Sequence, residues 1–162
     1  LFRSHADKIS NKDTDQLNIG LVFETDRNSN AHDDESIDPG LFENIFTEEH
    51  NVVCLDKYVT NKTLPDYCSE HISYSNLQEL SQVISNMDLI ITVDHLVAHL
   101  AGALNIDTIL MLPCVPNWRW DMNHRSNSPW YKSLKIYRQQ MPGDWSYVLN
   151  KVSKSLLEIK NG

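Results

Sequence analysis

Three polar side chains that lie close together in the sequence have the chemistry to bind an anion. Asp94, His95 and His99 follow an apolar run that ends at Val93, and a helix pattern begins at the same point. The first N–H groups of a helix have no partner within the helix, and they attract phosphate. A histidine near them can donate to an anion at neutral pH. We therefore expect a phosphate site made of Asp94, His95, Leu96 and His99.

Each of these side chains also has a purely structural interpretation. Asp is a favoured N-cap residue, so Asp94 could simply cap the helix. His99 could be a histidine at the edge of the core, bonded to a backbone carbonyl. His95 and His99 are four residues apart, which is a spacing of metal ligands, but position 96 is Leu where an H-E-x-x-H motif has its glutamate. We therefore expect no metal site.

A second group of candidates follows in a segment rich in aromatic residues. Trp118, Arg119 and Trp120 could stack on a base or a sugar, whereas aromatic side chains in loops commonly cover the edge of a core. Arg138 ends a strand pattern and could reach a phosphate through its planar guanidinium, or form a surface salt bridge. Asp144 begins the last helix pattern, where it is first an N-cap and second a ligand contact.

The elements that must position these residues alternate between strand and helix patterns. Apolar runs at residues 89–93 and 108–112 flank a helix pattern, and this is one βαβ unit of a parallel sheet. One side of that helix carries Leu96, Leu100, Ala103 and Leu104. Further strands are expected at residues 17–24, 51–55, 72–74 and 134–137, and further helices from Pro39 through residue 46, after the capping residue Asn76, and from Asp144 to residue 159.

These patterns predict an α/β protein, a Rossmann-like three-layer domain with a mostly parallel sheet. In such folds, ligands bind outside the carboxyl ends of the strands, which is where the candidate residues lie. Length and composition suit one globular domain over residues 17–160, preceded by a polar linker or arm at residues 1–16.

Charge and hydropathy exclude two classes of function. The net charge of −8 argues against a nucleic-acid partner, which would require a basic surface. No apolar run is long enough to form a transmembrane segment, and no signal-peptide pattern opens the chain, so we expect a cytoplasmic protein. The three cysteines match no metal or redox spacing and are expected to be free thiols.

Several motifs resemble one known family. The stretch from Asp94 onward resembles the D-T-x-x-x-H-L-A-x-A-L-G segment of the heptosyltransferase-like glycosyltransferases, glycosyltransferase family nine. The likeness is greatest to the bacterial branch in which this domain follows tetratricopeptide repeats. Residues 117–120, 128–131, 137–139 and 142–145 resemble that branch's P-D-W-R-W, S-P-W-Y, F-R-Q and P-G-D-W elements, in the same order. The resemblance covers roughly residues 17–157 and is most specific from Asp88 onward.

This resemblance implies a role in sugar transfer. The chain would be the carboxyl-terminal, donor-binding half of a GT-B glycosyltransferase that uses a nucleotide diphospho-sugar, with no metal or other cofactor. The amino-terminal half, which binds the acceptor and supplies the catalytic base, is absent from this chain, and no residue here stands out as catalytic. Backbone amides after Asp94 would stabilise the departing diphosphate, assisted by His99 and Arg138. Base or sugar contacts would come from Trp118, Arg119, Trp120 and Asp144.

Departures from the family pattern leave a second hypothesis open. Phe23-Glu24-Thr25 stands where W-S-G is frequent, Glu35 where an arginine is frequent, His95 where a threonine is usual, and Cys54-Leu55-Asp56 where S-L-Q is common. A carboxylate near a diphosphate repels it. The chain could therefore be a non-catalytic binding or scaffolding module that retains the half-domain fold. A dinucleotide oxidoreductase is disfavoured, because no G-x-G-x-x-G follows the first strand.

Overall fold

The computed structural model, which describes residues 16–25, 36–56, 63–120 and 126–160, confirms the Rossmann-like α/β fold. The expected arm at residues 1–16 lies almost wholly outside the described residues. Six strands form one sheet in the order β3-β2-β1-β4-β5-β6, and every neighbouring pair is parallel. The strands are β1 (Leu17–Val22), β2 (His50–Cys54), β3 (Glu70–His71), β4 (Leu89–Thr92), β5 (Thr108–Leu112) and β6 (Leu134–Arg138).

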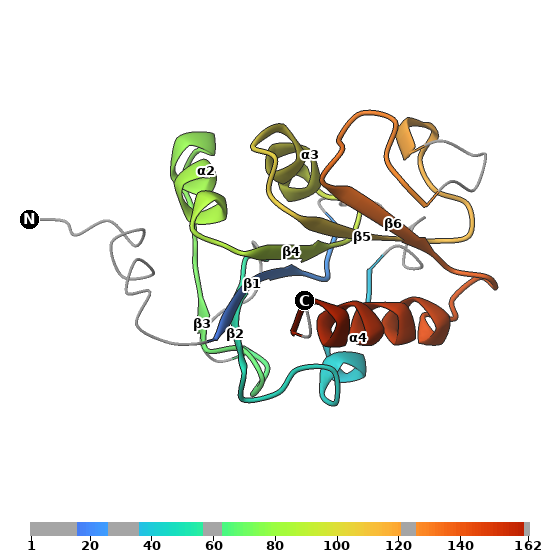
Figure 1. Cartoon of the computed structure of the whole chain (residues 1–162), viewed down its shortest axis with the longest axis horizontal. Helices are drawn as coiled ribbons and strands as arrows, with labels where there is room; N and C mark the ends of the chain where they lie inside the picture. Colours follow the sequence, from blue (N-terminus) through green and yellow to red (C-terminus); the bar gives the residue numbers. More distant parts are fainter. Residues whose placement is uncertain (1–15, 26–35, 57–62, 121–125, 161–162) are drawn as a thin grey trace, which may run out of the picture.

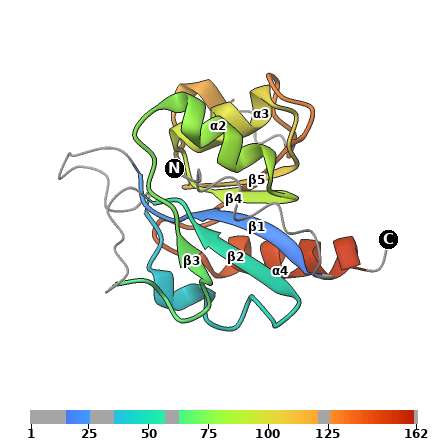
Figure 2. The same ribbon diagram turned by 90° about the vertical axis from the view of Figure 1, so that its left-hand side faces the viewer.

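Helices cover both faces of this sheet and make three layers (Figure 1). One face carries α2 (Leu77–Ser85) and α3 (Leu96–Ala103), and the other carries α4 (Ser146–Lys160). The 3₁₀ helix η2 (Pro39–Phe42) lies on the same side as α4, as Figure 2 also shows. A second 3₁₀ helix, η3 (Trp118–Trp120), follows β5. No helix in the described ranges combines the length and apolarity that a membrane crossing requires.

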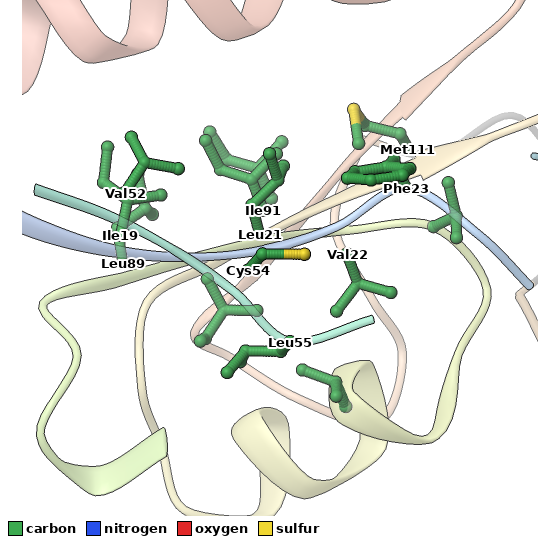
Figure 3. Packing of buried hydrophobic residues seen from close by; sticks show 14 of the residues in the cluster. Ile19, Leu21, Val22, Phe23, Val52, Cys54, Leu55, Leu89, Ile91 and Met111 are labelled. Atoms are coloured by element: carbon green, nitrogen blue, oxygen red, sulfur yellow. The ribbon is translucent and has the colours of Figure 1, made fainter. Parts of the chain in front are cut away.

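The central strands are apolar on both faces because both faces are covered. β4 and β5 are buried along their whole length. Successive side chains alternate between the two layers, so Leu21 and Ile91 point toward α4 while Val22 points toward α2 and α3 (Figure 3). This burial explains why the apolar runs of the sequence predict the strands within two residues at either end.

The edge strand β3 is displaced from its predicted position. The sequence predicts residues 72–74, whereas the ladder pairs Glu70 with Val53 and His71 with Cys54. Ile72 lies just past the strand and is buried, with its N–H on the carbonyl of Cys54. The apolar residue that suggested a strand, Ile72, is therefore the buried residue just after β3. The paired residues are half-buried at an exposed edge and carry no apolar pattern.

The helix caps follow the sequence closely in α2. Asn76 is the N-cap residue, and its side chain accepts from the Glu79 N–H at 2.9 Å. The Glu79 carboxylate in turn accepts from the N–H of Ser75 at 2.8 Å. Leu80, Val83 and Ile84 form the buried face, whereas Leu77 is 57% exposed. These reciprocal bonds satisfy donors that the helix itself leaves without partners.

The buried side of α3 is not the side that carries the leucines. Leu96 and Leu104 are 42% and 38% exposed, whereas Val97, Ala98, Ala101 and Gly102 are buried. The helix is apolar on nearly every side, so periodicity cannot select the face that packs. The small side chains of the buried face allow the helix axis to approach its neighbours closely.

Gly102 makes the closest of these contacts, with the ring of Tyr131. A Cβ atom at this position would lie 2.4 Å from Cγ of Tyr131. Tyr131 packs against a separate small core that contains Ala98, Leu110, Leu112, Trp120, Leu134 and Ile136. The ring of Tyr131 thus lies directly on the helix backbone, and this contact holds the segment after η3 against α3.

We expect Gly102→Ala to destabilise the fold by about 1–3 kcal/mol, because the added methyl group overpacks the contact with Tyr131. Urea unfolding measures the change. In a Tyr131→Ala background the clash is absent, so the same substitution should be neutral or stabilising by up to about 1 kcal/mol through helix propensity. Equal effects in the two backgrounds would contradict the contact.

Candidate functional site

The carboxyl ends of β4, β5 and β6 form one continuous edge. These strands are neighbours and run in the same direction, so the segments that follow them lie side by side (Figure 1). Asp94 follows β4, the turn η3 with Arg119 follows β5, and Arg138 is the last residue of β6. The structure therefore brings candidate residues to one edge of the sheet although Asp94 and Arg138 are 44 positions apart in the sequence.

His95, and not Asp94, is the N-cap residue of α3. Its backbone is extended, and its Nδ1 accepts from the N–H of Val97 at 3.2 Å. The N–H of Ala98 bonds to the His95 carbonyl at 3.0 Å. An imidazole that accepts at Nδ1 and is neutral carries its proton on Nε2. The N–H of Val97 is therefore not available to an anion. The sequence did not predict this cap, because histidine is not a preferred N-cap residue.

Asp94 pairs instead with Arg119. Its Oδ2 lies 3.5 Å from Nη2 of Arg119, and its side chain is 7% exposed. This distance is that of an ion pair without a well-formed hydrogen bond, and Oδ2 has no hydrogen-bond partner among the described residues. Arg119 keeps 40% of its side chain exposed. A cation thus lies beside the N-terminus of α3, next to the positive end of the helix dipole.

The backbone of Arg119 is held from both sides. Its N–H donates to Oδ1 of Asn117 at 3.3 Å, and its carbonyl accepts from Nε1 of Trp130 at 2.8 Å. Nη2 of Arg138 donates to the carbonyl of the next residue, Trp120. Arg138 thus braces η3 against β6, and neither of its two predicted roles, a phosphate contact or a surface salt bridge, describes this bond.

His99 lies between two aromatic side chains. Its ring stacks on Trp120 with centroids 4.7 Å apart and an interplanar angle of 21°, and its Nδ1 is 3.2 Å from the hydroxyl of Tyr131. Burial lowers the pKa of His99, the charge of Asp94 raises it and the charge of Arg119 lowers it further. His99 is therefore neutral at pH 7. When the Tyr131 hydroxyl donates to Nδ1, Nε2 carries the proton.

The three tryptophans between β5 and β6 divide between core and surface. Trp120 is 0% exposed and belongs to the small core beneath α3, so it takes the structural role of an aromatic plug. Trp118 and Trp130 are 76% and 65% exposed. Of the two tryptophans that the sequence proposes as base or sugar contacts, only Trp118 has a face open to solvent.

Asp144 lies apart from this cluster. Its Oδ1 accepts from the N–H of Ser146, the first residue of α4, at 2.9 Å, so its side chain satisfies a free N–H at the start of that helix from one position before the N-cap position, which is Trp145. α4 lies on the opposite face of the sheet from α3. The bonds from the side chain and the backbone of Ser146 lower the pKa of the Asp144 carboxyl. No contact between Asp144 and the Asp94–Arg119 pair occurs among the described residues.

Sequence reasoning missed Gln139 as a buried polar residue of this edge. Its side chain is 5% exposed, and Oε1 accepts from the N–H of Cys114 at 3.3 Å. Its Nε2 has no hydrogen-bond partner in the described part of the chain. The resemblance includes Gln139 in the motif that follows β6, but no local pattern indicates that this polar side chain is buried.

Sequence reasoning also missed Asp56, at the other end of the edge. This residue follows β2 and is 1% exposed, and its carboxylate accepts from the N–H groups of Phe23 at 3.2 and 3.3 Å and of Glu24 at 2.9 Å. Burial raises the pKa of Asp56 to about 7, the two backbone N–H groups lower it, and the charge of Glu24 raises it. Asp56 therefore holds the turn after β1, where the family pattern has a glycine.

Comparison with known proteins places this geometry in a known fold. No protein-family model matches the sequence, and no curated protein matches it. Among solved structures, the E. coli heptosyltransferase WaaC with ADP matches at a TM-score of 0.63 and 14% identity, over 88% of this chain and 44% of that chain. The E. coli ADP-heptose lps heptosyltransferase II matches at 0.58 and 14% identity, over 99% of this chain and 53% of that chain. E. coli WaaC with ADP-2-deoxy-2-fluoro heptose matches at a TM-score of 0.57 and 14% identity, over 96% of this chain and 47% of that chain.

The chain therefore spans about half the length of the solved structures that it matches. At this level of identity the likeness shows the fold. The described domain has the fold of one half of a GT-B heptosyltransferase. Within the described residues, no group of three or more His, Cys, Asp and Glu side chains could hold a metal ion.

We expect Asp56→Asn to gain stability relative to the wild-type chain as the pH rises toward 7. The pKa of about 7 in the folded chain lies above the ordinary carboxyl pKa of 3.8, which holds in the unfolded chain. The stability that the neutral carboxyl contributes is therefore complete below pH 3.8 and is lost as the pH rises through 7. The difference should grow by about 1.4 kcal/mol for each pH unit within this window and level off above it. Urea unfolding between pH 5 and pH 8 measures it, and a difference that is constant over this range would contradict the raised pKa.

Proposed function

We propose that this chain is the donor-binding half of a glycosyltransferase of the heptosyltransferase-like family, and that it binds a nucleotide diphospho-sugar. The observation that carries the proposal is the meeting of Asp94, Arg119 and His99 at the N-terminus of α3, in a domain with the fold of half a heptosyltransferase. Two of the similar structures hold ADP or an ADP-sugar analogue. That ligand class has two phosphates, a base and a sugar, and the phosphates and the base each have a chemical counterpart in the proposed site.

The proposed roles follow from the charges and the exposed surfaces. Arg119 and the N-terminus of α3 provide positive charge for the diphosphate, which avoids the need for a metal ion. His99 is neutral, so it serves as a hydrogen-bond donor to a phosphate oxygen. Trp118 offers an open indole face on which a base can stack. Stabilising the departing diphosphate is the catalytic contribution that we assign to this half.

Transfer requires components that this chain does not carry. A glycosyl transfer needs donor and acceptor held together in a reactive geometry, and one half of a two-part cleft holds only one of them. We place the acceptor and the catalytic base on an amino-terminal half of a longer protein. In the same proposal, that protein is bacterial and cytoplasmic and carries tetratricopeptide repeats.

A non-catalytic binding or scaffolding module is the second candidate. Two observations favour it. His95 uses the N–H of Val97 for its own cap, which reduces the donors available to an anion. At the β1–β2 end of the edge, Glu24 and Asp56 lie together, and ionised carboxylates there repel a diphosphate. Glu35, the other departure from the family pattern, lies outside the described residues.

Binding of ADP-, GDP-, UDP- and CMP-linked sugars, measured by calorimetry, tests the proposal and separates the two candidates. Affinity for one of these donors supports the glycosyltransferase half. No affinity in this chain or in a longer form with the amino-terminal half would support the scaffold.

We expect His99→Phe to weaken the binding of that donor by about 1–3 kcal/mol, because the ring keeps its stack on Trp120 but loses its donor N–H. Thermal unfolding should change little, since the aromatic contact is retained. Unchanged affinity in the same titration would assign His99 a structural role only.

We expect this chain to bind the donor without transferring its sugar. The assay is release of nucleoside diphosphate in the presence and absence of generic acceptors. Turnover above the rate of donor hydrolysis in buffer would show that the chain holds a complete active site and would contradict the half-site assignment.

A further inference from the structure

The Asp94–Arg119 pair has a feature that ion-pair stability alone does not explain. The carboxylate is 7% exposed, yet its Oδ2 meets the guanidinium only at 3.5 Å and has no hydrogen bond within the described residues. A buried carboxylate usually forms short, well-aligned bonds to its cation. This pair is therefore poorly optimised for stability alone, and the guanidinium retains donors for another group.

Hydrogen bonds fix the backbone of Arg119 and leave its side chain free to adjust. Asn117 and Trp130 bind its backbone N–H and carbonyl, and Arg138 binds the carbonyl of the following residue. The Arg119 side chain is 40% exposed, and its guanidinium contacts Asp94 through Nη2. Its Nε is buried without a hydrogen-bond partner among the described residues, so the Nη groups are the donors that a ligand can reach. Its charge also acts on His99, the other candidate phosphate contact.

From this geometry, and resting on the proposed function, we infer that Arg119 is the cation that binds the donor diphosphate and that Asp94 is the residue that positions it. Asp94 holds one edge of the guanidinium beside the N-terminus of α3, and the Nη N–H groups that Asp94 does not use bind phosphate oxygens. Arg138 has the different task of bracing η3 through the carbonyl of Trp120. The sequence alone favours Arg138 as the phosphate ligand, because Arg138 ends a strand.

This inference predicts an unusual sign for one substitution. Removing a negative charge near an anion site ordinarily strengthens anion binding, since it removes repulsion. If Asp94 positions Arg119, however, Asp94→Asn should weaken the binding of a diphosphate. The weakening should disappear when Arg119 is already absent, because Asp94 then has nothing to position.

The test measures binding of inorganic pyrophosphate and of ADP, GDP, UDP and CDP by calorimetry. None of these probes carries the transferred sugar of the donor, so a contact between Asp94 and that sugar does not affect them, and pyrophosphate also lacks the ribose. We expect Arg119→Gln to weaken binding about tenfold or more, as for loss of a hydrogen bond between charged groups, and Arg119→Lys to recover only part of it. Asp94→Asn should weaken binding about threefold to tenfold in the wild-type background and should have no effect in the Arg119→Gln background.

Two substitutions far from the site control for bulk charge. Lys151→Gln removes a positive charge from α4, and Asp107→Asn removes a negative charge next to the amino end of β5. Neither should change affinity beyond a small, salt-dependent effect. Thermal unfolding of each variant checks that the fold is retained.

Each outcome is decisive. If Arg119→Gln behaves like Lys151→Gln, Arg119 is not the phosphate ligand and the inference is wrong. Nucleotide-sugar binding by the wild-type chain would then still support the proposed function, with the diphosphate at the N-terminus of α3 and His99 alone. If Asp94→Asn strengthens binding, Asp94 only repels the anion and the positioning role is wrong. Pyrophosphate binding with the expected pattern, but no affinity for any nucleotide or nucleotide sugar, supports the inference and overturns the proposed donor. No affinity for any of these probes overturns both.

Discussion

The common direction of the six strands is the constraint on which the rest of this structure depends. Because every pair is parallel, all strand ends of one kind lie along the same edge of the sheet. Parallel strands need covered faces, so the sheet is apolar within and its polar residues are confined to the edges. Asp94 and Arg119 meet for this reason, and Arg138 reaches the carbonyl of Trp120 beside Arg119, although these segments are distant in the sequence.

The small residues on the buried face of α3 set how closely Tyr131 and Trp120 can pack against this helix. The ring of Tyr131 packs on Gly102, and Trp120 of η3 stacks on His99 of the same helix. The aromatic plug is therefore part of the support of the polar site. A larger residue at position 102 would move Tyr131, and with it the hydroxyl that faces the imidazole.

Charge is distributed unevenly along the same edge. The end near β4 and β5 has a helix N-terminus and Arg119, whereas the end near β1 and β2 has Glu24 and the buried Asp56. Asp56 satisfies two backbone N–H groups of the turn after β1, so its carboxyl stabilises a loop and does not face a ligand. Under the proposed function, this asymmetry favours an anionic ligand over α3 and away from the first strand.

The sequence by itself determined the fold class, the strands β1, β2, β4, β5 and β6, the cap of α2 and the edge at which the site lies. Local patterns carry this information, because a strand buried on both faces must be apolar and an N-cap must accept a backbone N–H. Only the tertiary structure decided which face of α3 is buried, that His95 caps it, that Trp120 is core and that Arg119 pairs with Asp94. These features depend on contacts between segments that are distant in the chain, and an irregular segment such as residues 113–133 has no period that predicts where its side chains point.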